Sequence, residues 1–317
     1  MNTPFLKKYQ PKKFNEFIID KDYVDVLKTL IKMDNLNILL IGNNGSGKTS
    51  LIEATIREYY GTDKIPHNNV LVINNLKDQG IQYYRNEVKT FSQTRSYIKG
   101  KKKIIILDDI DLINDQSQQV FRNCIDKFSY NVHFLASCTN IQKVIDSIQS
   151  RCCIIKIKPF KKNLLNKIFN NIKKKENIII DKKAQDLILN ICNNSVRQLI
   201  NYLEKFKILN VKITSDLVHE ICTNISFYEL EKYTNFCIQN NIVESVDVIF
   251  NIFKKGYSVM DILDNYFIFI KNTNMINEEL KYKIIKVICE YISIFHTIHE
   301  NELELVLFTN DLIKILL

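Results

Sequence analysis

The chain has 317 residues, 46% hydrophobic and 25% charged, which is ordinary for a globular protein that buries a core. Only 7 Gly and 4 Pro leave little room for linkers, and no apolar run reaches the roughly 18 residues of a membrane span. The opening residues lack the apolar core of a signal peptide, and the eight cysteines show no spacing typical of zinc sites. We therefore expect an intracellular protein of two or three domains with reduced thiols and no membrane contact.

The net charge of +9 is unevenly distributed along the chain. Residues 223–317 contain 8 Lys, no Arg and 13 Asp or Glu, so this part carries about −5 and the rest about +14. A basic first two-thirds fits a polyanionic partner, although a solvated surface alone gives the same balance. Only six of the 44 basic residues are Arg, so each guanidinium is a candidate for a role that Lys cannot fill.

Helix and strand patterns alternate in the first half of the chain. Apolar spacing predicts a helix over residues 16–33, with Asp20 as its N-cap. Beyond it, the patterns predict strands at 38–41, 68–75, 104–107 and 132–140, and helices at 82–93 and 117–129. Strands alternating with helices predict a parallel α/β sheet whose functional site lies at the carboxyl ends of the strands.

Strand patterns stop after Pro159. Residues 160–221 predict a compact helical domain, with its clearest helices at 181–192 and 195–206. From about residue 226 the pattern is again helical and richly apolar. We expect three domains, an α/β core, a smaller helical domain and an all-α domain, over residues 1–159, 160–222 and 223–317.

The stretch "GNNGSGKT" at residues 42–49 fits the P-loop pattern G-x-x-x-x-G-K-[ST]. A buried strand before it and a helix after it would surround a phosphate chain with backbone N–H groups and a helix N-terminus. Lys48 would reach the β- and γ-phosphates, and the Thr49 hydroxyl would ligate Mg²⁺. The alternative, a chance glycine-rich turn, does not require the flanking strand and helix. The predicted nucleotide-binding residues here are Gly42, Asn43, Asn44, Gly45, Ser46, Gly47, Lys48, Thr49 and Ser50.

A second acidic motif, "IIILDDID", places Asp108 at the end of a predicted strand. A carboxylate at that position can bind Mg²⁺ directly or through water. Asp109 would then lie beside the γ-phosphate and polarise the attacking water. An acidic turn after a buried strand would look similar, but the combination with the P-loop predicts a domain that binds and hydrolyses ATP.

Five segments resemble the small subunits of clamp loaders, the replication factor C family of AAA+ ATPases. The most specific is "IDSIQSRC" at residues 145–152, which is similar to the family's Ser-Arg-Cys motif. The others, in the family's order, are "PFLKKYQP", "GIQYYRNEVKTF", "QQVFRNCIDKFS" and "NNSVRQLIN". The resemblance covers residues 4–201, whereas the last third matches only in length and helical character.

The resemblance implies how the ATP site is completed. Arg151 matches an arginine finger that reaches the neighbouring subunit's ATP, and Arg197 matches a nucleotide sensor in the helical lid. Thr139 lies at the polar sensor position, although Asn140 beside it could serve instead. Tyr9 and Pro11 match the segment that folds over the adenine. We also expect Arg151 to follow the far edge strand of the sheet, with the P-loop on the other flank.

DNA contacts are implied at three positions. Arg85 and Lys89 match basic residues that follow the template strand, with a solvated helix surface as the alternative. Arg122 could contact DNA or couple it to the ATP site, or be an ordinary ion pair. Tyr83 and Tyr84 are more typical of core than of base-stacking residues.

The sequence also departs from the family at the ATP site. Asn43 and Asn44 stand where the family commonly has proline, and Gln10 replaces its usual arginine. Asp109 replaces the catalytic glutamate. Because aspartate is one methylene shorter, the attacking water could be poorly aligned, and misplacement by about 1 Å can cost about a hundredfold in rate.

The combined prediction is an AAA+ P-loop core with a helical lid and an all-α collar. Such a chain would assemble into a pentamer with other clamp-loader subunits and use ATP and Mg²⁺ to load a sliding clamp onto primer–template DNA. Two alternatives remain, an ATP-binding structural subunit with little hydrolysis, and a different DNA-associated AAA+ ATPase for origin recognition or branch migration. The resemblance implies a nuclear or viral replication compartment without deciding between them.

Overall fold

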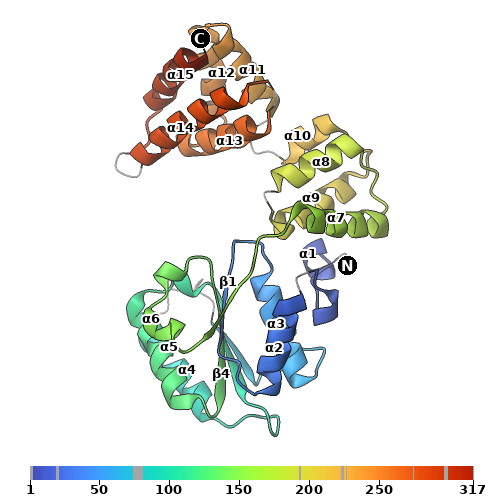
Figure 1. Ribbon diagram of the computed structural model, residues 1–317, viewed down its shortest axis with the longest axis vertical. Coiled ribbons are helices and arrows are strands. Elements are labelled where there is room, and N and C mark those ends of the chain that lie inside the picture. Colours follow the sequence, from blue (N-terminus) through green and yellow to red (C-terminus); the bar gives the residue numbers. More distant parts are fainter. Residues whose placement is uncertain are drawn as a thin grey trace. The chain divides into compact units, whose positions relative to one another are not determined.

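The computed structural model describes residues 3–18, 21–73, 81–192, 194–222, 225, 227–273, 275–295 and 299–316 (Figure 1). The chain divides into two compact units, one of residues 1–175 and 194–204 and the other of residues 176–193 and 205–317. The elements through the sheet are α1 (Phe5–Lys8), η1 (Phe14–Glu16), α2 (Lys21–Lys32), β1 (Ile38–Ile41), α3 (Lys48–Tyr60), β2 (Val70–Ile73), α4 (Ile81–Gln93), β3 (Lys103–Leu107), η2 (Ile110–Leu112), α5 (Asp115–Phe128), β4 (Val132–Cys138), η3 (Ile141–Lys143), α6 (Asp146–Gln149) and β5 (Cys153–Lys156). The elements that follow are α7 (Lys162–Glu176), α8 (Lys182–Ile191), α9 (Val196–Leu209), α10 (Ser215–Cys222), α11 (Phe227–Ile238), α12 (Ile242–Lys254), α13 (Val259–Asn272), α14 (Glu278–Ile294) and α15 (Leu303–Leu316).

The first unit contains a parallel sheet of five strands in the order β2-β3-β4-β1-β5. The predicted α/β class is confirmed, but β5 was not predicted, because Ile155 is its only buried residue. Strand β5 is an edge strand beside β1, and its first residue, Cys153, pairs with Ile38. The strand β4, which the sequence analysis expected at the far edge, lies in the centre of the sheet.

Alternating side chains of the strands fill two hydrophobic layers. In β3, Ile105 and Leu107 pack with the residues of α5, whereas Ile104 and Ile106 pack with those of α3. This alternation follows from the two-residue repeat of a strand. Helices α4, α5 and α6 cover one face of the sheet and α2 and α3 cover the other (Figure 1). A sheet covered on both faces leaves its carboxyl edge as the place where a ligand can reach the backbone.

Local sequence signals explain where the main helices begin and end. Helix α3 starts directly after Gly47 and stops at Gly61, which has a φ of 65° and donates its N–H to Arg57 and Glu58 carbonyls. Helix α5 is capped by Asn114, whose side chain accepts a hydrogen bond from the Ser117 N–H at 2.9 Å. The expected N-cap of α2, Asp20, lies outside the described residues.

A buried polar cluster lies at the amino-terminal side of the sheet. His133 in β4 is 2% exposed, and its Nε2 lies 3.1 Å from Oδ1 of Asp34. The Tyr59 hydroxyl donates to the same oxygen at 2.8 Å and accepts from the Lys102 N–H at 2.9 Å. His133 Nδ1 accepts from the Leu36 N–H at 3.4 Å, so the neutral ring carries its proton on Nε2.

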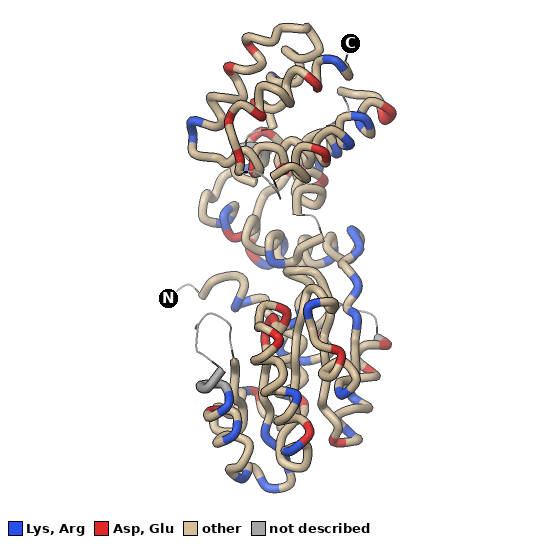
Figure 2. Tube along the Cα trace, turned by 90° about the vertical axis from the view of Figure 1, so that its left-hand side faces the viewer, with Lys and Arg blue, Asp and Glu red and all other residues tan. Residues whose placement is uncertain are grey.

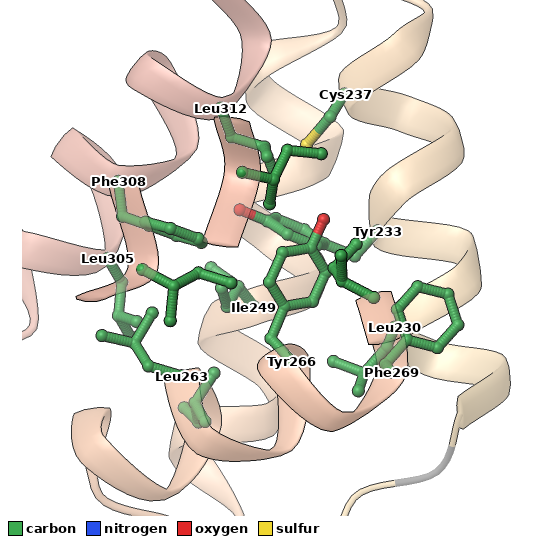
Figure 3. Close-up of a cluster of buried hydrophobic side chains, with 14 of the residues drawn as sticks. Leu230, Tyr233, Cys237, Ile249, Leu263, Tyr266, Phe269, Leu305, Phe308 and Leu312 are labelled. Atoms are coloured by element: carbon green, nitrogen blue, oxygen red, sulfur yellow. The ribbon is translucent and has the colours of Figure 1, made fainter. Parts of the chain in front are cut away.

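In the described part of the second unit, the regular elements are helices, apart from an isolated bridge between Ile180 and Ile213, which confirms the helical prediction for the C-terminal region. Helices α8 and α10 pack together near that bridge. Helices α11 to α15 surround a core that contains Tyr233, Tyr266 and Phe308 (Figure 3). The Tyr233 hydroxyl is 2.9 Å from the Thr309 hydroxyl, so a buried hydrogen bond joins α11 to α15. The three-domain division at residues 159 and 222 stays a prediction.

Charged positions occur throughout both units (Figure 2). None of the helices in the described ranges is long and apolar enough to cross a membrane. All eight cysteines are free thiols.

Candidate ATP site and its surroundings

A cavity of about 800 Å³ opens at the carboxyl edge of the sheet, within the first unit. The N-terminal segment, the P-loop and helices α7 and α9 contribute to its wall. Most of the predicted nucleotide-binding and catalytic residues line it, namely Tyr9, Pro11, Asn44, Gly45, Ser46, Gly47, Lys48, Thr49, Ser50, Asp108, Asp109 and Arg197. Gly42 and Asn43 lie in the same loop but outside the lining residues. The volume suits a nucleotide-sized ligand.

The P-loop depends on two left-handed glycines. Gly45 has a φ of +76° and Gly47 a φ of +87°, a region that side chains disfavour. Gly47 immediately precedes α3, whose first N–H groups are therefore directed toward the cavity. The loop thus provides backbone donors and the positive end of a helix at one place, which is the arrangement that binds phosphate.

Lys48 is the buried cation of the P-loop, with 7% of its surface exposed. Its ammonium group donates to the carbonyl of Gly42 at 2.7 Å and to that of Asn43 at 3.3 Å. Burial lowers the pKa of Lys48, while the carboxylates of Asp109 and Asp108 oppose that shift. These hydrogen bonds to the loop carbonyls hold the Lys48 side chain along the loop. Its positive charge therefore lies at the wall of the cavity.

Thr49 and Asp108 meet at the base of the cavity. The Thr49 hydroxyl lies 3.2 Å from Oδ2 and 3.4 Å from Oδ1 of Asp108. The Ser137 hydroxyl in β4 donates to Oδ1 of Asp108 at 2.5 Å and accepts from the Asp109 N–H at 3.1 Å. A hydroxyl and a carboxylate are oxygen donors that suit Mg²⁺, which retains several waters when bound. The residues present therefore fit the expected ion.

Asp109 follows Asp108 into the cavity with a φ of 50°. Burial is the main cause that raises the pKa of Asp109, and the neighbouring Asp108 adds to it, whereas Lys48 and Arg197 act in the opposite direction. A carboxylate with a raised pKa is a better proton acceptor than an ordinary aspartate.

Asp111 is a residue of this site that the sequence analysis did not single out. It is 7% exposed, and its Oδ2 accepts from the Thr139 hydroxyl at 2.5 Å, the Thr139 N–H at 3.1 Å and the Asn140 N–H at 3.0 Å. Burial raises the pKa of Asp111, but these hydrogen bonds bring it below the usual value. Neither Thr139 nor Asn140 lines the cavity, and the Asn140 side chain caps the Gln142 N–H. The sensor role of Thr139 stays a prediction.

The N-terminal segment is tied to two helices of the same unit. The Gln10 side chain donates to Glu53 of α3 at 3.1 Å, and the Phe5 N–H donates to Glu204 of α9 at 3.1 Å. The Tyr9 ring lies between Lys8 and Lys175, whose ammonium nitrogens are 5.7 and 5.8 Å from its centroid. Gln10, which stands where the family commonly has arginine, thus attaches this segment to the P-loop helix.

Arg151 lies at the opposite end of the sheet from the P-loop. It lies two residues before β5, whose start is level with the start of β1, whereas the P-loop follows the end of β1. The expectation that Arg151 follows the far edge strand, with the P-loop on the other flank, is wrong, because β5 was missed and pairs with β1. Four strand residues at about 3.3 Å each nevertheless separate Arg151 from the P-loop along the sheet.

The predicted DNA-binding residues divide into two groups. Arg85 and Lys89 of α4 line a groove of about 230 Å³ between α4 and α5, which we call the basic groove. Its other lining residues are Val120, Asn123, Cys124, Lys127 and Phe128. Arg122 is not among them, because its side chain turns to Asn123 at 3.2 Å and to Asp126 at 3.5 Å. Lys127 is a third cation of this groove that the sequence analysis missed.

Comparison with known proteins shows which families and relatives this chain is similar to. Residues 38–160 match the ATPase family associated with various cellular activities (AAA), and residues 228–292 match the replication factor C C-terminal domain. A protein of Acanthamoeba polyphaga mimivirus that is named as a replication factor C small subunit is 28% identical over 290 residues, which cover 91% of this chain and 90% of the relative. The replication factor C small subunit of Methanococcus maripaludis strain C7 is 28% identical over 292 residues, or 92% of each chain. The chain thus combines an AAA domain with a replication factor C C-terminal domain and is similar to replication factor C small subunits over about nine-tenths of its length.

Solved structures agree with this family at the level of the fold. A DNA polymerase III gamma subunit-related protein from Thermotoga maritima has a TM-score of 0.55 at 13% identity, over 92% of this chain and 99% of that one. The RuvB Holliday junction branch migration motor of the same organism has a TM-score of 0.54 at 17% identity, over 74% and 80%. The match of residues 38–160 to the AAA family supports ATPase activity in general for this chain.

Proposed function

We propose that this chain is a clamp-loader small subunit that binds ATP with Mg²⁺ and couples hydrolysis to loading a sliding clamp at primer–template junctions. The observation that carries the proposal is that the phosphate-binding residues and Arg151 lie at opposite edges of the same sheet. Lys48, Thr49 and Asp108 lie at the carboxyl edge, whereas Arg151 lies at the amino edge. A subunit built this way supplies a phosphate-binding site at one edge of its sheet and a guanidinium group at the other. An ATP site formed between two neighbouring subunits requires both.

Each cavity residue has a role in this proposal. Lys48 and the P-loop amides bind the β- and γ-phosphates, and Tyr9 and Pro11 cover the base. Arg197 contacts the nucleotide from α9. Thr49 and Asp108 would hold Mg²⁺, which would supply positive charge against the phosphates of the nucleotide. Asp109 orients the water that attacks the γ-phosphorus and accepts its proton as the bond to the β,γ-bridging oxygen breaks.

Arg151 completes the site of a neighbouring subunit. Its guanidinium stabilises the charge that develops on the transferred phosphoryl group, and such fingers are worth about 10³–10⁵ in rate. A pentamer of clamp-loader subunits with a helical collar from residues 223–317, joined through a lid from residues 160–222, would bring these edges together. Within its own chain, Thr139 acts on the ATP site indirectly, through Asp111, to which its hydroxyl donates a hydrogen bond.

DNA binding is assigned to the basic groove. Arg85, Lys89 and Lys127 present three cations over an apolar floor, which suits the phosphates of a nucleic-acid strand. Contacts of this kind are independent of base sequence and sensitive to salt. The protein would act where DNA is replicated, in a nucleus or in a viral replication compartment.

A second candidate function is an ATP-binding subunit that hydrolyses little ATP at its own site. The observation that favours it is the short carboxylate at Asp109, whose N–H is fixed to Ser137. In that case the chain would still provide Arg151 to its neighbour. An origin-recognition or branch-migration role is disfavoured by the match of residues 228–292 to the replication factor C C-terminal domain.

The test compares Arg151→Ala with Lys48→Ala in reconstituted pentamers. Steady-state ATPase is measured with clamp and primer–template DNA, beside equilibrium binding of a fluorescent ATP analogue to each free subunit. Arg151→Ala should bind ATP normally as a free subunit and lower the ATPase of the assembly, whereas Lys48→Ala should lose its own ATP binding. Arg95→Ala, at an exposed loop position, is the matched control.

Two results would contradict the proposal. In the first, Arg151→Ala weakens ATP binding by the free subunit but leaves the ATPase activity of the assembly unchanged. That result would mean that Arg151 acts within its own chain or not at all. The other is an affinity pull-down in which the chain co-purifies with no other clamp-loader subunit, which would favour a different AAA+ role.

A further inference from the structure

We propose that Asp126 of α5 is a positioning residue for Arg151, holding the guanidinium in the orientation that a neighbouring ATP site needs. The inference rests on the proposed action of Arg151 in trans. It assigns a role to a carboxylate that no motif indicated. It also means that the Arg151 side chain is already oriented in the single subunit.

The Arg151 side chain is held through two of its three nitrogens. Nε donates to Oδ1 of Asp126 at 2.5 Å, and Nη1 donates to the Ser147 carbonyl at 2.7 Å, with the Ser150 hydroxyl 3.4 Å away. The hydrogen bond from Arg151 is the main cause that lowers the pKa of Asp126, so the carboxylate remains charged. Contacts from α5 on one side and α6 on the other fix the plane of the guanidinium.

The remaining nitrogen, Nη2, makes no hydrogen bond within the described part of the chain, and the side chain is 30% exposed. An arginine withheld from its target would be expected to have a carboxylate across its outer N–H groups, where bidentate pairing is strongest. Here Asp126 binds the inner Nε instead and leaves Nη2 available to a phosphate oxygen. The geometry therefore indicates presentation of the finger rather than its sequestration.

Asp126 is itself held from its other oxygen. Nε of Arg122, one turn earlier on α5, lies 3.5 Å from Oδ2 of Asp126. The three side chains form a row of two cations around one anion, so their net charge is positive and suits an incoming phosphate. Arg122 thus acts on the finger through Asp126. Because Asn123 and Lys127 of the same helix line the basic groove, α5 contributes both to this groove and to the carboxylate that binds the finger.

The experiment measures kcat and KM of ATP hydrolysis by reconstituted pentamers that carry Asp126→Ala, with clamp and DNA present. A free finger populates many rotamers, so kcat should fall by about tenfold, within the roughly hundredfold that misplacement can cost. KM, the ATP affinity of the free subunit and its melting temperature should stay near wild type, because the residue is at the surface and outside the cavity. Asp126→Glu should recover part of the loss. Asp115→Ala, an exposed carboxylate at the start of the same helix, is the matched control.

The double variant Asp126→Ala with Arg151→Ala separates positioning from general damage. If Asp126 acts through Arg151, the double variant should be no slower than Arg151→Ala alone. Wild-type or higher kcat for Asp126→Ala, together with a slow Arg151→Ala, would overturn this inference and leave the shared site intact. An Arg151→Ala pentamer with wild-type kcat would instead overturn the proposed function on which the inference rests.

Discussion

A β-carbon on Gly45 would lie 2.2 Å from the hydroxyl oxygen of Ser195, which precedes helix α9. No real contact is that short, so the P-loop and the start of α9 approach more closely than any side chain at position 45 allows. Since Arg197 follows two residues later and lines the cavity, this approach places the lid arginine beside the phosphate loop.

Gly45→Ala should therefore weaken ATP binding more than it weakens the fold. The left-handed φ of +76° costs about 1–2 kcal/mol for a side chain, and Ser195, two residues before Arg197, must in addition shift to relieve the contact. The measurement is equilibrium binding of a fluorescent ATP analogue beside thermal unfolding. Adding Ser195→Gly should relieve the clash and restore part of the affinity.

Gly100→Ala provides the control for backbone strain alone. Gly100 has a φ of +72°, and nothing lies within 4 Å of the position where its β-carbon would be. It should lose similar stability and bind ATP as the wild type does. If Gly45→Ala also keeps wild-type affinity, the close approach of α9 has no part in nucleotide binding.

Substitutions of Asp109 test whether the short acid limits turnover. Asp109→Asn should retain ATP binding and slow hydrolysis by about 10² or more, because a general base contributes that much. Asp109→Glu should bind ATP equally well and raise turnover, since the added methylene brings the carboxylate closer to the water. Single-turnover hydrolysis by assembled pentamers gives both rates. An Asn variant as fast as wild type would assign the ATPase activity of the assembly to other subunits.

The double variant Arg85→Ala with Lys89→Ala tests the basic groove. Loss of two phosphate contacts should weaken primer–template binding equally for all sequences and flatten the salt dependence of log K by about 0.9 per contact on duplex DNA. Fluorescence anisotropy over a salt series measures both effects. Arg95→Ala with Lys99→Ala removes two exposed cations outside the groove and is the control. A loss confined to some sequences would contradict a phosphate-tracking role.

His133 should make the stability of the chain sensitive to mild acid. Burial lowers the pKa of His133 below its ordinary value of 6.5, against the opposing effect of Asp34. The unfolded chain then binds a proton more readily than the folded one, so the free energy of unfolding should fall as the pH drops below about 6.5, by at most about 1.4 kcal/mol per pH unit for one proton.

Urea unfolding between pH 7.5 and 5 measures this dependence. His133→Gln should flatten it, whereas His67→Gln, at an exposed turn, should leave it unchanged. Equal slopes in all three proteins would mean that other groups cause the acid sensitivity.

The parts of the site that the sequence predicted are those held within one short segment. The P-loop and Asp108 each carry their chemistry next to the strand that positions them, so a local pattern indicates both. Strand β5 was missed because three of its four residues are exposed and carry no alternating signal. That omission also misplaced Arg151 relative to the sheet edges.

Contacts between distant segments were not predictable from local patterns. Asp111 meets Thr139, and Asp126 meets Arg151, only because β3, β4 and the helices between them pack in a particular register. Ser195 reaches Gly45 across about 150 residues of chain. No spacing rule connects such pairs, so they required the three-dimensional structure.

The hydroxyl of Ser137 has a consequence for how this site can evolve. It binds the side chain of Asp108 and the backbone of Asp109 together, so a change at position 137 would shift the proposed metal ligand and the proposed base at once. Replacing the Asp109 side chain alters only one of them. Substitution at position 109 is therefore the route by which the side chain beside the predicted Mg²⁺ ligand can change while the contact between Ser137 and Asp108 is kept.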